Sequence, residues 1–255
     1  MTNVSIFLPD YVEEVDDEQL DLGKAIALHL LPGAAIMLTY IILAWVLRPF
    51  SLPSLLPFLF AIPITLIPVE LGYLLYQGKQ RNGRYSLEGI VLYRQPLTIK
   101  KFTGYTLLTL IGMLALFLLL GFTDSFMLQY FFAWWPAWLM PDYATLMQGS
   151  TTLLIVGIIL TMLLANLVAP AIEELYFRGY LLPRMARYDR WGFILNGALF
   201  AVYHFWSPWS VFSRAIAVLP LGIAARKGNV YVSVAAHCLI NTLGFLLVMP
   251  MLLGQ

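Results

Sequence analysis

The chain has 255 residues, of which 60% are hydrophobic and only 11% are charged, and its formal net charge is +1. Because roughly a quarter of the residues of a soluble domain carry a charge, this composition excludes an ordinary soluble domain and indicates an integral membrane protein. A membrane-spanning helix needs about 20 apolar residues, so about six to eight spans would use most of the chain. The single cysteine, Cys238, excludes an intrachain disulfide and a multi-cysteine metal site.

The chain begins with an acidic segment, residues 1–24, which we expect to form a solvated tail on the cytoplasmic side. Seven of the 14 acidic residues lie between Asp10 and Asp21, ahead of the first apolar stretch. Long apolar stretches follow, and each can cross a bilayer as a helix. They cover residues 25–47, 52–77, 102–122 and 151–172.

Three weaker apolar stretches complete the chain, at residues 191–206, 211–225 and 230–252. They contain polar residues and two of them are short, as expected of helices packed inside a bundle. The predicted fold is therefore an all-α, polytopic transmembrane helix bundle of about seven spans, within a range of about six to eight. We expect residues 25–150 to form amino-terminal transmembrane helices with an interfacial segment, and residues 151–255 to form the bundle that carries the functional site.

The Lys and Arg residues of the connecting segments predict the orientation. The connections at residues 79–101, 184–190 and 226–227 contain most of them, and all three fall on the same side of a seven-span bundle. The connection at residues 124–149 has none and carries aromatic residues typical of the headgroup region. The positive-inside rule then places the amino terminus in the cytoplasm. We expect the protein to lie in a bacterial plasma membrane.

Two adjacent carboxylates and an arginine stand at the end of the fourth apolar stretch, in the sequence AIEELYFRG. Charges inside a membrane are costly and usually functional. Glu174 and Arg178 are four residues apart and meet on one helix face, where such a pair holds the structure or orients a neighbour. Glu173 is rotated by about 100° from Glu174, so it is a candidate general base. The alternative is that both acids simply pair with Arg178 and other basic groups.

Two of the three histidines lie in later apolar stretches, each with a polar companion. His204 follows Asn196 by about two helical turns, and His237 stands four residues before Asn241, which places the latter two on one helix face. A lone histidine of this kind is usually a satisfied bundle residue. The grouping of two histidines with two glutamates indicates one functional cluster.

A simple helical arrangement keeps two members of this cluster apart. Glu173 would end its helix at the cytoplasmic face, whereas His204 would lie about 18 Å along a helix that begins at Trp191. We expect tilt, a later helix start or a continued fourth helix to bring them together around a wet cavity. His29 and Glu70, in the first two apolar stretches, are interpreted as structural.

The ordered motifs E-E-x-x-x-R, F-x-x-x-H and H-x-x-x-N resemble the signature of the CPBP intramembrane endopeptidases, an Abi-like family that includes the type II CAAX prenyl proteases. The residues that carry the motifs here are Glu173, Glu174, Arg178, Phe200, His204, His237 and Asn241. The resemblance implies that residues 151–255 form a catalytic bundle. It also implies hydrolysis of a peptide bond in a membrane-associated or prenylated substrate, at a site reached from the cytoplasm.

The resemblance further implies roles for the individual residues. Glu173 and His204 would activate a water molecule. His237 and Asn241 would stabilise the tetrahedral oxyanion, a role that suits fixed donors in a water-poor cavity. The second glutamate and the arginine of the first motif would hold the site in shape.

The same side chains allow a metal-dependent alternative. Glu173, His204 and His237 would bind zinc and leave one position for water, as catalytic zinc sites do. However, the ligands come from three helices and no H-E-x-x-H motif is present. We therefore favour the metal-free mechanism. Zinc is the one cofactor that the alternative mechanism would require.

Two functions of other classes remain as alternatives. A non-proteolytic membrane protein of the same fold would act as an immunity factor or as a regulatory partner of another membrane protein. A transporter would use buried Glu, His and Asn groups as an ion path, although paired inverted halves are not evident. The expected partners are a peptide or protein substrate and the lipid bilayer, and no nucleic-acid-binding module is recognisable.

Overall fold

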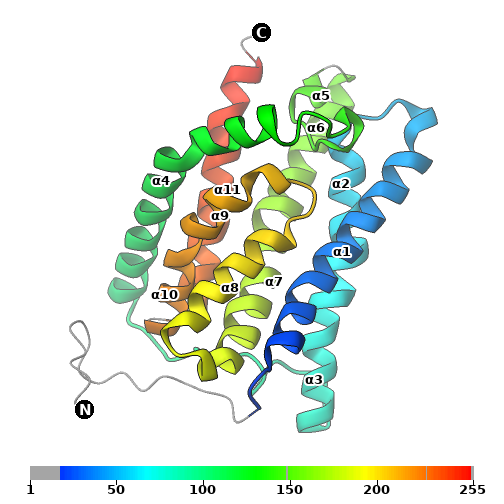
Figure 1. The fold of residues 1–255 in the computed structure, drawn as a ribbon. Coiled ribbons are helices and arrows are strands. Elements are labelled where there is room, and N and C mark those ends of the chain that lie inside the picture. Colours follow the sequence, from blue (N-terminus) through cyan, green and yellow to red (C-terminus); the bar gives the residue numbers. More distant parts are fainter. Residues whose placement is uncertain (1–17, 148, 228, 254–255) are drawn as a thin grey trace.

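The computed structural model describes residues 18–147, 149–227 and 229–253, and within these ranges every regular element is helical (Figure 1). The predicted acidic tail falls largely outside the described residues. The α-helices in chain order are α1 (Leu22–Val46), α2 (Leu55–Ala61), α3 (Gly72–Asn82), α4 (Ile99–Tyr130), α5 (Ala144–Met147), α6 (Thr151–Leu160), α7 (Ala169–Glu173), α8 (Arg190–Tyr203), α9 (Val211–Ala217), α10 (Leu219–Lys227) and α11 (Val230–Leu253).

Within the described ranges, six helical stretches are long and apolar enough to cross a membrane. They are Leu22–Val46, Leu55–Asn82, Ile99–Tyr130, Thr151–Tyr188, Pro208–Lys227 and Val230–Pro250. This confirms the all-α polytopic bundle, with the number of spans at the lower end of the expected range. The stretch predicted at residues 191–206 is α8, whose 14 residues extend about 21 Å and do not cover a hydrocarbon core of about 30 Å.

Two of the spans contain wide, π-helical turns beside prolines. Ile62–Leu71 contains prolines, and Thr161–Val168 ends shortly before Pro170. A proline has no backbone N–H and removes one hydrogen bond from the helix, and a π-helical turn accommodates the irregularity. These turns bear on the site, because Glu70 lies in the first of them and Glu173 follows the second.

The fourth span continues well beyond its predicted end. Helical structure runs without a break through Thr151–Tyr188, so the expectation that Glu173 ends its helix at the membrane face is wrong. The side chains of Glu173, Glu174 and Arg178 are 5%, 0% and 1% exposed. Because they are buried against other helices, this polar stretch remains helical inside the bundle. Glu173 therefore lies within the span rather than at its end.

The helices around His204 are shorter than predicted. α8 ends at Tyr203, and His204 occupies the cap position after it. The single helix predicted at residues 211–225 is two helices, α9 and α10, which meet at Val218. Pro220 lies in the first turn of α10, where its missing N–H ends the hydrogen bonding of α9. These breaks place a loop, and with it His204, inside the bundle.

Helix α1 packs closely on the end of α8. A Cβ atom on Gly33 would overlap the backbone carbonyl oxygen of Tyr203 and its ring. Only glycine therefore permits this approach, which fixes the backbone immediately before His204.

Replacing Gly33 by valine is expected to destabilise the protein by about 1–3 kcal/mol or more, because the new side chain forces α1 away from α8. Thermal unfolding in detergent measures the effect. Gly104 provides the control, since nothing lies within 4 Å of a Cβ built there. Equal melting temperatures for Gly33→Val and Gly104→Val would contradict this packing.

The aromatic segment predicted for the outer connection begins at the end of α4, which extends to Tyr130. The side chains of Tyr130, Phe131, Trp134 and Trp138 are all more than half exposed. An interfacial anchor requires exposure of this kind. The anchor role itself stays a prediction.

Candidate active site

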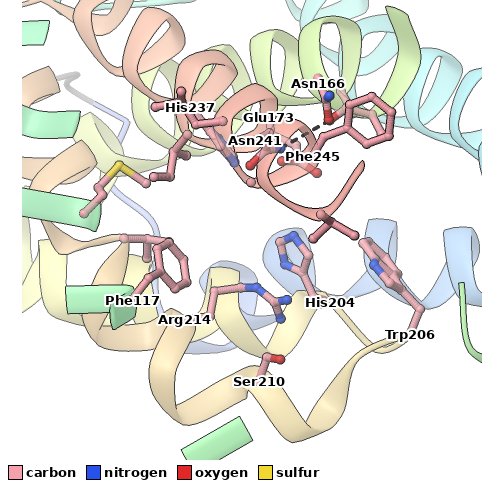
Figure 2. A pocket seen from close by; sticks show the side chains of 18 of the residues that line it. Phe117, Asn166, Glu173, His204, Trp206, Ser210, Arg214, His237, Asn241 and Phe245 are labelled. Atoms are coloured by element: carbon pink, nitrogen blue, oxygen red, sulfur yellow. Dashed lines mark hydrogen bonds between the residues drawn. The ribbon is translucent and has the colours of Figure 1, made fainter. Parts of the chain in front are cut away.

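A cavity of about 670 Å³ lies inside the bundle, among α1, α2, α4, α7, α8, α9 and α11 (Figure 2). Its wall is mostly apolar, and Figure 2 shows Phe117 and Phe245 among the side chains that line it. Polar side chains gather in this apolar surrounding. They are Asp124, Tyr143, Asn166, Glu173, His204, Ser210, Arg214, His237 and Asn241.

Four of the six predicted site residues line this cavity: Glu173, His204, His237 and Asn241. They come from α7, the end of α8 and α11, so Glu173 and His204 line the same cavity. The continued fourth span was one of the possibilities considered from the sequence, whereas the early end of α8 was not. The first motif's other members, Glu174 and Arg178, lie behind the cavity wall.

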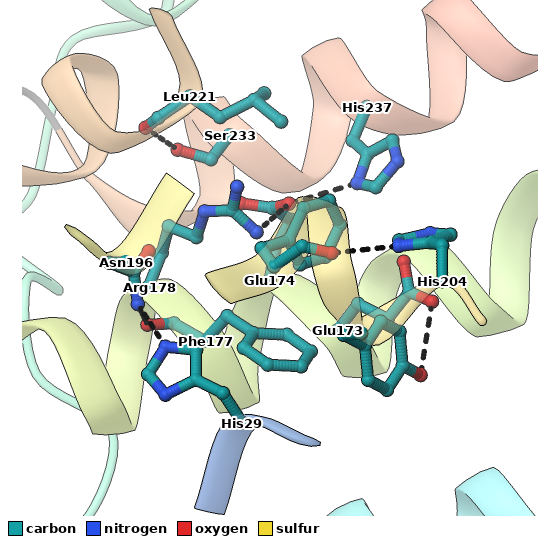
Figure 3. A network of polar contacts seen from close by, with 12 residues as sticks. His29, Glu173, Glu174, Phe177, Arg178, Asn196, His204, Leu221, Ser233 and His237 are labelled. Atoms are coloured by element: carbon teal, nitrogen blue, oxygen red, sulfur yellow. Dashed lines mark hydrogen bonds and ion pairs between the residues drawn. The ribbon is translucent and has the colours of Figure 1, made fainter. Parts of the chain in front are cut away.

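Glu174 is the acceptor at the centre of a buried polar network (Figure 3). Its Oε1 lies 3.2 Å from Nη1 of Arg178 and 2.9 Å from Nδ1 of His237. The Arg178 guanidinium also stacks on the Phe200 ring, with its Cζ 4.0 Å from the ring centroid. The network orients His237 so that Nδ1 faces Glu174, which leaves Nε2 of His237 for the cavity.

The orientation of His204 is fixed by the backbone. Its Nδ1 lies 2.8 Å from the carbonyl oxygen of Phe200. A carbonyl oxygen can only accept, so Nδ1 carries the hydrogen and, in the neutral ring, Nε2 has a free lone pair. His204 therefore presents a proton acceptor to the cavity that it lines.

The Asn241 side chain is fixed by one backbone contact. Its Nδ2 donates to the carbonyl oxygen of Ala165 at 3.2 Å, which ties α11 to the π-helical turn before α7. An amide group has two N–H bonds, so the second remains for a ligand in the cavity. Asn241 and His237, one turn apart on α11, both line the cavity.

Asn196 does not belong to the site, although the sequence suggested that it accompanies His204. Its Nδ2 lies 3.0 Å from Nε2 of His29 and 3.0 Å from the carbonyl oxygen of Phe177 (Figure 3). Nδ1 of His29 in turn donates to the carbonyl oxygen of Ala25 at 2.7 Å. This network connects α1, α8 and the fourth span, as a structural role for His29 requires.

Sequence reasoning missed three polar residues at the site. No role was predicted for Arg214 from the sequence, yet it lines the cavity, and its Nη2 donates to Oγ of Ser207 at 3.0 Å. Tyr203 and Glu70 approach Glu173 from behind: the Tyr203 hydroxyl lies 2.7 Å from Glu70 and 3.4 Å from Glu173. The rarity of ionisable residues inside membrane spans was the available signal for Glu70.

The cavity occupies a particular half of the bundle. Its lining residues on α4 run from Met113 to Asp124, and those on α11 run from His237 to Val248. Both sets lie toward the carboxy-terminal ends of their helices, away from the Lys- and Arg-rich connections. This placement does not by itself support the predicted opening toward the cytoplasm, which stays a prediction.

The zinc alternative, with Glu173, His204 and His237 as ligands, stays a prediction. Within the described ranges, no group of three or more His, Cys, Asp and Glu side chains is placed to hold a metal ion. The Nδ1 atoms of both cavity histidines are already engaged, by Phe200 and Glu174. We derive no catalytic step through a metal.

The fold and the cavity together define a polytopic, all-α membrane protein with a buried glutamate, histidine and asparagine site. Residues 155–243, about a third of the chain, match the family model described as type II CAAX prenyl endopeptidase Rce1-like. This match supports the assignment of these helices to the CPBP and CAAX protease family, which the motifs resemble, and it supports CAAX-type intramembrane protease activity in general. Comparisons with curated proteins and with solved structures give no match.

Proposed function

We propose that the protein is an intramembrane endopeptidase that hydrolyses a peptide bond with a water molecule activated by Glu173 and His204. The observation that carries this proposal is the meeting of both side chains with His237 and Asn241 at one cavity inside the bundle. A carboxylate and a neutral imidazole in such a position can both accept a proton from water.

The proposed reaction begins with water between Glu173 and His204. Glu173 accepts a proton as the water oxygen forms a bond to the peptide carbonyl carbon, and the carbonyl oxygen becomes an oxyanion. Collapse of the tetrahedral intermediate breaks the C–N bond, and the proton held by Glu173 passes to the departing amine. His204, whose Nε2 is free, positions the water as a hydrogen-bond acceptor.

His237 and Asn241 are the proposed oxyanion donors. Asn241 supplies its second amide N–H. His237 bonds through Nδ1 to Glu174, so Nε2 faces the cavity and donates a hydrogen bond when both ring nitrogens carry a hydrogen. The Glu174 and Arg178 pair thus prepares a donor, in addition to holding the helices together.

Asn241→Ala is expected to lower kcat by about 10²–10³-fold, the usual effect of removing one oxyanion donor. Steady-state cleavage of a peptide measures the change, and KM should move little because the donor acts in the transition state. Thr242→Ala, at the neighbouring α11 position, is the control. A loss confined to KM would contradict the oxyanion role.

The substrate class proposed is a membrane-associated peptide, including prenylated, CAAX-like carboxy-terminal peptides. The largely apolar wall of the cavity suits an apolar side chain or lipid group. Arg214 adds a cation at the same wall and could bind a carboxylate of such a peptide. Cleavage of matched peptides with and without a prenyl group, read by mass spectrometry, tests this choice.

A metal-free enzyme should keep its full activity after exhaustive chelation. We expect kcat and KM to be unchanged when the purified protein is treated with a strong chelator and assayed in metal-depleted buffer. Loss of cleavage that added zinc restores would contradict the proposed mechanism and return Glu173, His204 and His237 to the role of ligands.

A non-proteolytic immunity factor or regulatory partner with the same fold is the second candidate. No described feature favours it over hydrolysis, since every motif position is occupied by a residue able to act. Binding of another membrane protein that is unaffected by Glu173→Gln, together with absence of cleavage, would select it.

A further inference from the structure

Behind the cavity, a second carboxyl group lies beside the proposed base. Glu70, in the second span, is 0% exposed, and Tyr203 between the two acids is also 0% exposed. The Tyr203 hydroxyl oxygen lies 2.7 Å from Oε1 of Glu70 and 3.4 Å from Oε1 of Glu173. Three oxygens, from the second span, α8 and the fourth span, thus form a short, almost completely buried chain.

The number of hydrogens limits how this chain is arranged. A tyrosine hydroxyl has one hydrogen and can donate it to only one of its two neighbours. A hydrogen bond at the other contact needs a hydrogen supplied by a carboxyl group. Two ionised carboxylates on either side of one hydroxyl would also repel each other in a site shielded from water. The arrangement is therefore satisfied by one carboxyl hydrogen shared between Glu70 and Glu173.

The surroundings of Glu70 favour its neutral form in this pair. Glu70 has no ion-pair partner in the described part of the chain, and its Oε2 is buried without a hydrogen bond. Arg178 and His237 do not contact Glu70, because both pair with Glu174. An ionised group without a partner is costly in such a place.

We propose that Glu70, Tyr203 and Glu173 act as one unit, in which Glu70 holds the carboxyl hydrogen and thereby leaves Glu173 as the ionised base. This inference rests on the proposed function of Glu173. In the active arrangement Glu70 donates to the Tyr203 oxygen and Tyr203 donates to Glu173. Shifting both hydrogens by one bond gives the inactive arrangement, with the carboxyl hydrogen on Glu173, and no proton is gained or lost.

Glu70 is a positioning residue in this scheme, because it acts on the base only through Tyr203. The alternative is that the Glu70 to Tyr203 hydrogen bond simply fastens the second span to the end of α8. A fastening role affects folding stability, whereas the proposed role affects kcat and the protonation of Glu70. The two can therefore be separated by experiment.

The kinetic test compares Glu70→Gln, Glu70→Leu and Tyr203→Phe in peptide cleavage. Glu70→Gln can donate an amide N–H to Tyr203 as the protonated carboxyl group does, so it should keep kcat within about threefold. Glu70→Leu and Tyr203→Phe break the chain, and each should lower kcat by about tenfold or more with KM within about twofold. Thr65→Val, which removes the 2.7 Å contact to Thr39 from the same π-helical segment, is the control and should leave kcat unchanged. A tenfold loss in Glu70→Gln, or unchanged kcat in Glu70→Leu and Tyr203→Phe, would overturn the proposal.

Infrared difference spectroscopy tests the same proposal without any substrate. At neutral pH the parent protein should show a protonated carboxyl C=O band that Glu70→Gln removes and Tyr203→Phe shifts. Glu173→Gln should retain the band. No band in the parent, or a band that survives Glu70→Gln and disappears in Glu173→Gln, would refute Glu70 as the holder of the hydrogen. This readout separates failure of the shared-proton unit from failure of the peptidase assignment.

Discussion

Glutamine in place of Glu173 is expected to lower kcat for peptide cleavage by about 10²–10⁴-fold, while the protein remains folded. The amide has the size of the carboxylate but cannot accept the proton of the attacking water. Because Glu173 is 5% exposed at the wall of the cavity, a neutral amide there should not disturb packing. Steady-state kinetics in detergent, with thermal unfolding as the folding check, measures the effect.

The same prediction extends to His204. His204→Gln should reduce kcat severely, and the double variant with Glu173→Gln should be little worse than either single one, since the two groups act on one water molecule. Asp124→Asn makes the carboxylate-to-amide change elsewhere on the cavity wall and is the matched control. Cleavage that survives in Glu173→Gln, or an equal loss in Asp124→Asn, would contradict the assignment of the base.

Replacing Arg178 by leucine is expected to destabilise the protein by about 3–5 kcal/mol, because it leaves the Glu174 carboxylate buried without its cation. Glu174 is 0% exposed, and its remaining hydrogen-bonding partner is His237. Lowered stability should be accompanied by lost activity, since His237 depends on Glu174 for its orientation. Thermal or denaturant unfolding of the purified protein measures the change in free energy.

The chain provides a matched control for this experiment. Arg84 and Glu88 form a salt bridge with the same four-residue separation, but their side chains are 66% and 71% exposed. Solvent screens such a pair, so Arg84→Leu should cost about 0–1 kcal/mol. Similar losses for the two arginines would show that the buried network is not what stabilises the site.

Composition and motifs predicted much of the architecture and of the site. Apolar length alone was enough to predict a polytopic helix bundle. The spacing of Glu174 with Arg178 predicted their contact, because residues four apart share a helix face. The three motifs also pointed to Glu173, His204, His237 and Asn241, which line one cavity.

What the sequence did not predict depends on contacts between distant segments. Hydropathy ended the fourth helix before Glu173, since burial and pairing of the polar side chains are invisible in a single sequence. Asn196 was assigned to His204 by helical spacing, whereas it bonds His29 on another helix. Glu70 stands far from the motifs in the chain, and Arg214 lies between two of them without a motif of its own. Only the folded arrangement places Arg214 at the cavity and Glu70 behind Glu173.

Cleavage of a peptide library that includes prenylated peptides, by the detergent-purified protein beside Glu173→Gln, tests the central claim most directly. The account predicts defined products with new carboxyl and amino termini for the parent protein, and none for the folded variant. No product from the folded parent across a broad library would contradict hydrolysis and favour a non-proteolytic partner of the same fold.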